Sequence, residues 1–266
     1  VALANKYNIE EIVVSVQNRR GGFPIKELLD CKLQGLKVTD AATFFERETN
    51  QIRVDSLQPS WLVFGGGFDQ SFMRIFMKRS FDIICSMLIL VATFPFMFIT
   101  AALIYLEDRS PIFYSQERVG KDGKSFKVMK FRSMRNDAEK GGKPQWAAQN
   151  DPRVTRVGNF IRKTRIDELP QILNVFKGEM SFVGPRPERP YFVEQLIEVV
   201  PYYNVRHSIK PGITGWAQVR YGYGSSAEDA LQKLQYDLYY VKNNSLFLDV
   251  LILIDTLKVV LFRSGR

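Results

Sequence analysis

The feature that most constrains the fold is an apolar run at residues 83–106, which contains no charged side chain. A helix of roughly 24 residues is about 36 Å long, enough to cross a hydrocarbon core of about 30 Å. Pro95 lies near the middle of the run, where it removes a backbone hydrogen bond and favours a kink. The run therefore predicts a membrane helix that either spans the bilayer once or breaks at Pro95 and returns to the side it entered.

The flanks of this run favour the re-entrant arrangement. Cys31 and Cys85 lie in different kinds of segment, so the chain has no disulfide framework and suits a reducing compartment. The cationic half after the run requires a cytosolic substrate, which places both flanks on the cytoplasmic side. Lys78 and Arg79, just before the run, are then expected to meet anionic lipid headgroups.

A second informative stretch follows at residues 161–190. A helix that ends at Gly178 is predicted by apolar residues at helical spacing, namely Leu169, Ile172, Leu173 and Phe176. Asp167 is expected to cap this helix, and Pro170 lies in its first turn, where a missing N–H is harmless. Asp167 and Glu168 would thus lie at a helix N-terminus, which attracts anions.

Cations surround this pair of carboxylates. Arg162 and Arg165 precede it, and the rigid run Pro185-Arg186-Pro187 follows. Two carboxylates among this many cations predict a phosphate site that also holds a metal ion. The same residues also suit a capped surface helix with solvated charges, and this stretch by itself leaves both interpretations open.

Composition restricts the partners. The net charge of +9 and the isoelectric point near 9.5 favour nucleic acid, phosphorylated substrates or acidic lipid. The single histidine, His207, argues against Ser-His or Cys-His catalysis and is expected to be structural or exposed. The chain begins at Val1 without an initiator methionine or a signal-peptide pattern, so an N-terminal truncation is expected.

An α/β piece is predicted for residues 1–67. Residues 11–16 and 36–39 have the pattern of strands, a helix begins at Pro24, and Asp40 caps a second helix. Two strands are too few for an independent sheet, so the piece is interpreted as part of a larger α/β module.

A hairpin is predicted after the apolar run. Residues 112–117 and 126–134 pair around the turn formers Asp122 and Gly123, and Lys130 lies on the second strand. The polar stretch that follows, at residues 136–152, is predicted to be a mobile loop.

Three helices are predicted towards the end of the chain, at residues 191–200, 227–242 and 246–262. The last is strongly apolar yet short and carries three charges, so it is expected to lie at the bilayer surface or in the core rather than to span. Arg220 lies in a Gly/Pro-rich loop at residues 210–224, which either cradles a phosphate or a base or forms an ordered turn. Arg220 is accordingly a candidate substrate-binding residue.

Together these residues resemble the bacterial sugar transferases, the monotopic phosphoglycosyl transferases that start polysaccharide assembly on polyprenyl phosphate. The resemblance covers residues 78–266 in the family's order. It rests on Lys78-Arg79 with Asp82 ahead of the interrupted run, and on VMKFRSM, IRKTRIDELPQ, GEMSFVGPRP, KPGITGWAQV and YDLYYVKN. Each piece alone is weak, but all of them in order are highly specific. Residues 1–67 look like the end of the cytosolic domain of long-form members, without their N-terminal membrane helices.

The resemblance implies a membrane-associated α/β (α+β) chain of three parts. A partial Rossmann-like module is expected at residues 1–67, and a linker with the re-entrant helix at residues 68–107. Residues 108–266 are expected to form a compact, mostly helical catalytic domain with a short β-hairpin and amphipathic interfacial helices.

The resemblance also implies roles for single residues. Asp167 matches the nucleophile and Glu168 a Mg²⁺ ligand. The remaining matches are polar active-site residues, a segment near the uridine and the membrane break, at Lys130, Arg162, Asp237, Pro185-Arg186-Pro187 and Pro95. Phe94 stands where the family often has Ser before that proline, which leaves the break to Pro95 alone.

The implied reaction transfers a sugar 1-phosphate from a UDP-sugar to polyprenyl (undecaprenyl) phosphate and releases UMP. A carboxylate suits this chemistry because it is ionised at neutral pH and can leave again. Adjacent residues on a helix point about 100° apart, so Asp167 and Glu168 are not expected to share a proton. The implied location is the cytoplasmic face of the bacterial inner membrane. Anionic lipid is an implied partner, and a second copy of the chain is a candidate partner. No residue of the sequence identifies the sugar, although long-form members of the family often use glucose or galactose.

The sequence leaves two alternatives to this covalent route. One is a single-step, metal-dependent transfer in which Glu168 or Asp237 activates the lipid phosphate. The other is a non-enzymatic basic module that binds nucleic acid or acidic lipid at a membrane. It accounts for the charge but not for the carboxylates beside residues 185–187, so no nucleic-acid partner is expected.

Overall fold

The structure is a computed structural model that describes residues 4, 6–15, 23–54, 66–135, 138, 151–222, 224 and 226–262. It divides into two compact units, Val1–Gly65 and Gly66–Arg266. Most of the loop predicted at 136–152 lies outside the described residues, and so does Val16 at the end of the first predicted strand.

The first unit contains a parallel strand pair with a crossover helix. Strand β1 (Glu11–Val14) pairs in parallel with β2 (Lys37–Asp40), and α2 (Ile25–Leu33) connects them. Helix α3 (Ala41–Thr49) begins at Asp40, whose carboxylate accepts a hydrogen bond from Thr43 N at 3.0 Å. This arrangement confirms the predicted strands, helices and cap, with boundaries shifted by one or two residues.

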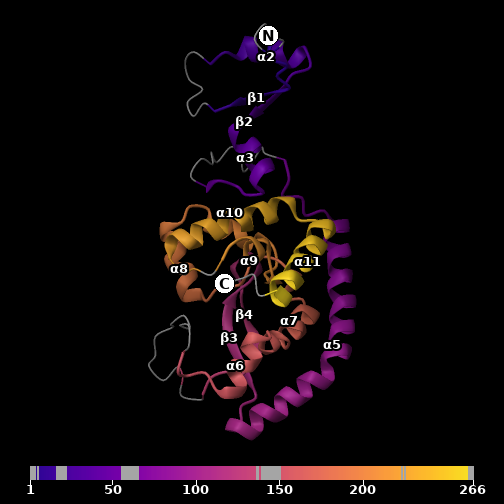
Figure 1. Ribbon diagram of the computed structural model, residues 1–266, viewed down its shortest axis with the longest axis vertical. Helices are drawn as coiled ribbons and strands as arrows, with labels where there is room; N and C mark the ends of the chain where they lie inside the picture. The colour runs from indigo at the N-terminus through magenta and orange to yellow at the C-terminus, as the bar shows by residue number, and fades with distance from the viewer. Residues whose placement is uncertain are drawn as a thin grey trace. The chain divides into compact units, whose positions relative to one another are not determined.

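The second unit opens with one long helix, α5 (Phe72–Asp108, 37 residues), with Pro95 inside it. It bends partway along its length (Figure 1), as expected where proline removes an i→i−4 hydrogen bond. Within the part of the chain that the structure describes, α5 alone is long and apolar enough to cross a membrane. Its apolar side chains are widely exposed, among them Val91, Phe94, Phe98 and Leu106.

The beginning of α5 is bound to the rest of this unit. Lys78 Nζ lies 2.6 Å from Asp249 Oδ2, and Arg79 donates hydrogen bonds to Val175 O and Phe176 O, both at 2.7 Å. Both side chains thus have protein partners, and their contact with lipid headgroups stays a prediction. Protein carbonyls and a carboxylate satisfy their charges because the last turn of a neighbouring helix leaves its carbonyls without intrahelical partners.

The end of α5 is bound to the same unit. The Glu107 carboxylate accepts hydrogen bonds from Arg156 N at 2.9 Å and Val157 N at 3.0 Å. Arg132 Nη2 donates to Asp108 O at 2.9 Å. Both flanks of the apolar run are thus attached to one compact body.

The predicted hairpin follows α5. Strand β3 (Phe113–Val119) pairs antiparallel with β4 (Ser125–Phe131), and Asp122 in the turn has φ 55°. The remaining elements are α6 (Arg156–Lys163), η3 (Ile166–Glu168), α7 (Gln171–Lys177), β5 (Ser181–Val183), α8 (Pro190–Val199), η4 (Tyr203–Ser208), β6 (Gly212–Thr214), α9 (Trp216–Arg220), α10 (Ala227–Asn243) and α11 (Leu246–Phe262). The helices predicted near the C-terminus are therefore confirmed.

The Gly/Pro-rich stretch at 210–224 is largely ordered structure. Its first part forms β6, which pairs in parallel with β5, and α9 follows. The two backbones approach closely because a Cβ on Gly212 or Gly215 would collide with the backbone of Gly184. This contact joins two motifs that lie about thirty residues apart in the sequence.

One hydrophobic core lies beneath these elements. Its buried side chains come from β4, α7, β5, α9, α10 and α11, and include Val128, Val175, Met180, Trp216 and Tyr240. Cys85, Ile89 and Leu90 of α5 pack against this core. Helices α10 and α11 cover one end of the unit in Figure 1, and the hairpin β3–β4 lies beside α6 and α7.

Candidate active site

The two adjacent carboxylates lie in a 3₁₀ turn, Ile166–Glu168, ahead of α7. Asp167 does not cap α7, whose N-cap is Pro170 without a side-chain hydrogen bond. The reason is local: Pro170 has no N–H to donate to Ile166 O, so Leu169 N makes this bond instead, at 3.1 Å. The predicted cap is wrong, whereas the predicted stop at Gly178 is confirmed by its φ of 90°.

Helix α7 is fastened to β4 by a buried amide. Asn174 Nδ2 donates to Lys127 O at 2.8 Å, and Asn174 Oδ1 accepts from Met129 N at 3.1 Å. The buried face differs from the predicted one, because Phe176 is 43% exposed while Asn174 and Val175 are buried. The amide bonds fix the turn that carries the carboxylates against the strand that carries Lys130.

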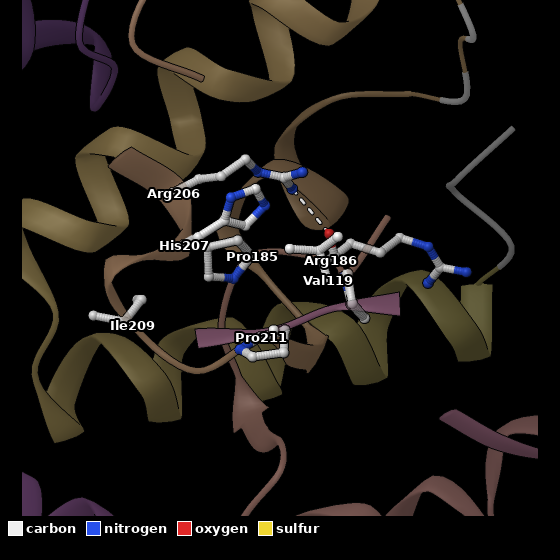
Figure 2. Close-up of a pocket in the computed structure, with 9 residues that line it drawn as sticks. Val119, Pro185, Arg186, Arg206, His207, Ile209 and Pro211 are labelled. Atoms are coloured by element: carbon white, nitrogen blue, oxygen red, sulfur yellow. Dashed lines mark hydrogen bonds between the residues drawn. The ribbon is translucent and has the colours of Figure 1, made fainter. Parts of the chain in front are cut away.

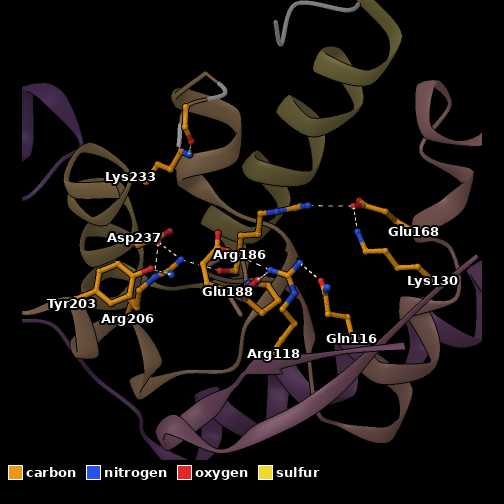
Figure 3. A network of polar contacts seen from close by, with 12 residues as sticks. Gln116, Arg118, Lys130, Glu168, Arg186, Glu188, Tyr203, Arg206, Lys233 and Asp237 are labelled. Atoms are coloured by element: carbon orange, nitrogen blue, oxygen red, sulfur yellow. Dashed lines mark hydrogen bonds and ion pairs between the residues drawn. The ribbon is translucent and has the colours of Figure 1, made fainter. Parts of the chain in front are cut away.

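Glu168 is held by two cations. Its Oε1 lies 2.7 Å from Lys130 Nζ and 3.4 Å from Arg186 Nη2 (Figure 3). Burial by itself would raise the pKa of Glu168, but the charges of Arg186 and Lys130 outweigh it and lower this pKa below its ordinary value. Glu168 is therefore ionised at neutral pH.

Asp167 has a different environment. It is 8% exposed, and its Oδ1 is buried without a hydrogen-bond partner among the described residues. Burial and the charge of Glu168 raise the pKa of Asp167, and Lys130, Arg165 and Arg162 oppose the rise. The structure thus brings a carboxylate oxygen that no described residue binds into a cluster of cations.

The segment Pro185-Arg186-Pro187 lies beside this cluster. Arg186 points its guanidinium toward Glu168, while its carbonyl oxygen accepts a hydrogen bond from Arg206 Nη2 at 2.9 Å (Figures 2 and 3). A small pocket behind the segment is lined by Val119, Gly120, Pro185, Arg186, Pro187, Arg206, His207, Ile209 and Pro211. His207 is buried there, and burial together with Arg206 lowers its pKa to about 4. It is therefore neutral at physiological pH.

Two predicted site residues have partners outside the carboxylate cluster. Asp237 is buried on α10, and its Oδ2 lies 2.7 Å from Arg206 Nη2. The Arg220 guanidinium lies 4.2 Å from the centre of the Trp216 ring and pairs with Asp255 at 3.5 Å. Contacts therefore join Lys130 and Arg186 to Glu168, while Asp167 lies next to Glu168 in the same turn and Arg162 acts on it through its charge.

The sequence of this second unit matches a known family. The family model for bacterial sugar transferases matches residues 73–263. The chain belongs to the bacterial sugar transferase family. The resemblance noted from its motifs is thereby confirmed.

Relatives in this family are named for related activities. The UDP-N-acetylgalactosamine-undecaprenyl-phosphate N-acetylgalactosaminephosphotransferase of Aeromonas hydrophila is 44% identical over 238 residues, which are 90% of this chain and 55% of that protein. The UDP-glucose:undecaprenyl-phosphate glucose-1-phosphate transferase of Escherichia coli K12 is 43% identical over 178 residues, 65% of this chain and 38% of that protein. An exopolysaccharide production protein of Rhizobium leguminosarum is 42% identical over 198 residues, 72% of this chain and 98% of that protein. The chain thus spans about half the length of the Aeromonas sugar transferase.

Two arginines of this family member were not recognised from the sequence. Arg118 donates to Pro187 O at 3.1 Å across 69 positions, and Arg206 bonds Asp237 across 31 positions. A lone arginine in a strand or a turn gives no local signal of such partners. They become recognisable only when the fold brings the segments together.

The carboxylates fit the Mg²⁺ that the family implies. Mg²⁺ is usually held in proteins by one or two carboxylates, with substrate phosphates and water as the other ligands. Among the described residues no group of three His, Cys, Asp or Glu side chains could hold a metal ion. The buried Oδ1 of Asp167 accepts from none of the described residues, and the neighbouring Glu168 is ionised. Such a pair suits an ion that arrives with a diphosphate substrate.

Proposed function

We propose that this chain is a polyprenyl-phosphate sugar-1-phosphate transferase that works through a covalent aspartyl intermediate. In this proposal it transfers a sugar 1-phosphate from a UDP-sugar to undecaprenyl phosphate and releases UMP. The observation that carries it is the buried Asp167 Oδ1, which has no donor among the residues that the structure describes and lies beside Glu168, itself bound by Lys130 and Arg186. The activities for which the relatives are named support this choice of substrates.

The first step forms one bond and breaks another at the same phosphorus. An Asp167 carboxylate oxygen attacks the phosphorus that carries the sugar, and the bond from that phosphorus to the bridging oxygen of UMP breaks. Arg186 is placed to neutralise charge on the departing phosphate, since it lies at the edge of the cluster and is 41% exposed. In the second step an oxygen of undecaprenyl phosphate attacks the same phosphorus, and Asp167 leaves as a carboxylate.

Glu168 would hold Mg²⁺, which supplies charge neutralisation on the diphosphate when bound. Lys130 keeps Glu168 ionised and oriented through their 2.7 Å contact. The positive charges of Lys130, Arg165 and Arg162 also favour the anionic form of Asp167, which is the form that attacks.

The acceptor requires a membrane, and α5 supplies an element suited to it. The exposed apolar side chains of α5 form one extended apolar surface, much larger than the single exposed apolar residues common on soluble proteins. Lys78 at one end of the apolar run and Glu107 at the other bind the same unit, which supports a re-entrant rather than a spanning helix. The proposed location is the cytoplasmic face of the bacterial inner membrane, where UDP-sugars and undecaprenyl phosphate meet.

The donor sugar is proposed from the relatives alone. The Aeromonas relative, which matches 90% of this chain, acts on UDP-N-acetylgalactosamine by its name, and other relatives are named for glucose or galactose. We therefore place N-acetylgalactosamine first. A panel of these UDP-sugars with undecaprenyl phosphate, scored by UMP release, tests the choice.

The covalent route is tested with Asp167→Asn. We expect this variant to lose UMP release, and wild type incubated with UDP-sugar alone to gain the mass of a phospho-sugar on the peptide that contains residue 167. Asp122→Asn, in the exposed hairpin turn, serves as the control and should behave as wild type. An active Asp167→Asn enzyme without adduct on the wild type would support the one-step alternative, whose kinetics would not be ping-pong.

A further inference from the structure

The backbone of residues 185–188 is held at every carbonyl. Each of these four carbonyl oxygens accepts a hydrogen bond from a different group. Two of the donors are backbone amides: Gly212 N binds Pro185 O at 3.0 Å, and Val119 N binds Glu188 O at 2.9 Å. They extend the neighbouring strands β6 and β3 onto the two ends of the segment.

The two inner carbonyls accept from arginine side chains. Arg206 Nη2 donates to Arg186 O at 2.9 Å, and Arg118 Nη1 donates to Pro187 O at 3.1 Å. Each guanidinium is itself paired with a carboxylate, and that of Arg206 is the better buried. Its partner Asp237 accepts from Nη2 at 2.7 Å and from Nε at 3.0 Å.

Arg206 uses its whole planar fork. In addition to Asp237 and Arg186 O, it donates from Nη1 to Tyr203 Oη at 2.8 Å, and its side chain is 6% exposed. An ion pair buried to this degree costs desolvation free energy that packed apolar side chains would not. A lysine could not make these three contacts from one fixed plane. The geometry therefore indicates that Arg206 orients the segment 185–188, rather than only adding to the stability of the fold.

Arg186 depends on this support. Its own side chain makes a 3.4 Å contact with Glu168 and is 41% exposed, so the side chain is weakly held at its tip. The position of its backbone therefore determines which groups the guanidinium can reach. Arg206 binds the carbonyl of that same residue.

We propose that Arg206, held by Asp237, is a positioning residue that aims Arg186 at the substrate diphosphate. Asp237 then acts through Arg206 and not as a base toward the lipid phosphate. The inference rests on the proposed function, because Arg186 needs a diphosphate to bind. It gives Asp237, a residue matched to the family's active site, a physical role three contacts away from Glu168, through Arg206 and Arg186 (Figure 3).

A double-mutant cycle tests this assignment. Arg206→Lys and Asp237→Asn should each lower kcat/KM for UMP release about tenfold or more in the wild-type background, as expected for a displaced binding group. In an Arg186→Ala background the same changes should matter less than about twofold, because residues that act through one another are not additive. Arg47→Lys, in the first unit, is the matched control and should change neither background.

A second readout separates positioning from loss of fold. Affinity for UDP, measured by calorimetry on the detergent-solubilised full chain, should fall in Arg206→Lys and in Arg186→Ala, and no further in the double variant. Tyr203→Phe, a milder change to the same guanidinium, should show the same coupling if Arg206→Lys fails to fold. Losses that add in both backgrounds would overturn the inference while leaving the transferase intact. A wild type that releases no UMP from any UDP-sugar would instead overturn the proposed function, and the inference with it.

Discussion

Lys130 Nζ lies 2.7 Å from Glu168 Oε1, and this cation acts on Glu168 together with Arg186. The pKa of Glu168 is lowered, whereas the pKa of Asp167 is raised. Two adjacent acidic residues therefore have different tasks available to them. Glu168 stays ionised and bound to cations, and Asp167 presents a buried oxygen without a donor in the described part of the chain.

The first prediction concerns pH. In the proposed reaction Asp167 attacks as a carboxylate, so activity should fall as the pH drops through its pKa, which burial and Glu168 hold above the ordinary aspartate value. Lys130 opposes that rise. In Lys130→Met the acidic limb of the kcat/KM profile should therefore move to higher pH. Lys124→Met, at the exposed hairpin, should leave the limb in place. A limb that moves to lower pH in Lys130→Met would contradict the assignment of Asp167.

The second prediction concerns the attachment of the apolar helix. Lys78 pairs at 2.6 Å with Asp249, whose side chain is 2% exposed and also accepts a hydrogen bond from Tyr240. Lys78→Met leaves a buried carboxylate without its cation, so it should lower the free energy of unfolding by about 3 kcal/mol. Thermal unfolding of the full chain in detergent measures the loss.

An exposed pair provides the control for that variant. Lys258 lies 3.2 Å from Asp255, and its side chain is largely exposed. Lys258→Met should change the free energy of unfolding by about 0.5 kcal/mol or less. Equal losses for Lys78→Met and Lys258→Met would show that the Lys78 contact does not hold α5.

The third prediction concerns the strand contact behind the site. A Cβ on Gly212 would meet the backbone of Gly184, which cannot move without breaking the pairing of β5 with β6. Gly212→Ala should lower the free energy of unfolding by about 1–3 kcal/mol and also reduce UMP release. Gly66→Ala has open space around its Cβ and should match wild type. Normal stability and activity in Gly212→Ala would rule out this close approach.

The fourth prediction concerns the side of the membrane. In a background of Cys31→Ser and Cys85→Ser, single cysteines at Gln70 and Lys124 lie before and after α5, and both positions are exposed. A re-entrant α5 should let an impermeant maleimide reach both in inside-out vesicles and neither in intact spheroplasts. Labelling from opposite sides would identify a spanning helix.

Pro95→Ala sharpens the same measurement. Without the proline, α5 can continue as a straight helix whose apolar run is long enough to cross the hydrocarbon core. We expect part of the population to label from opposite sides. Phe94→Ala alters the neighbouring side chain without restoring an N–H and should keep the wild-type pattern.

Local sequence was sufficient for most of the elements. The apolar run predicted the long helix, Asp122-Gly123 predicted the hairpin, and Asp40 predicted a helix start, because each is decided by contacts within a few residues. The motifs were also sufficient for the family, which the match over residues 73–263 confirms.

Tertiary structure decided how these parts are used. Lys78 and Arg79 looked like lipid-facing charges, yet they bind Asp249 and the end of α7, partners that lie far away along the chain. Asp237 matched a polar active-site position, and the structure pairs it with Arg206. Periodicity and spacing in the sequence indicate which residues are neighbours within one helix or strand. A buried charge, in contrast, pairs with whichever opposite charge the packing of distant segments brings near, because an unpaired buried charge costs free energy.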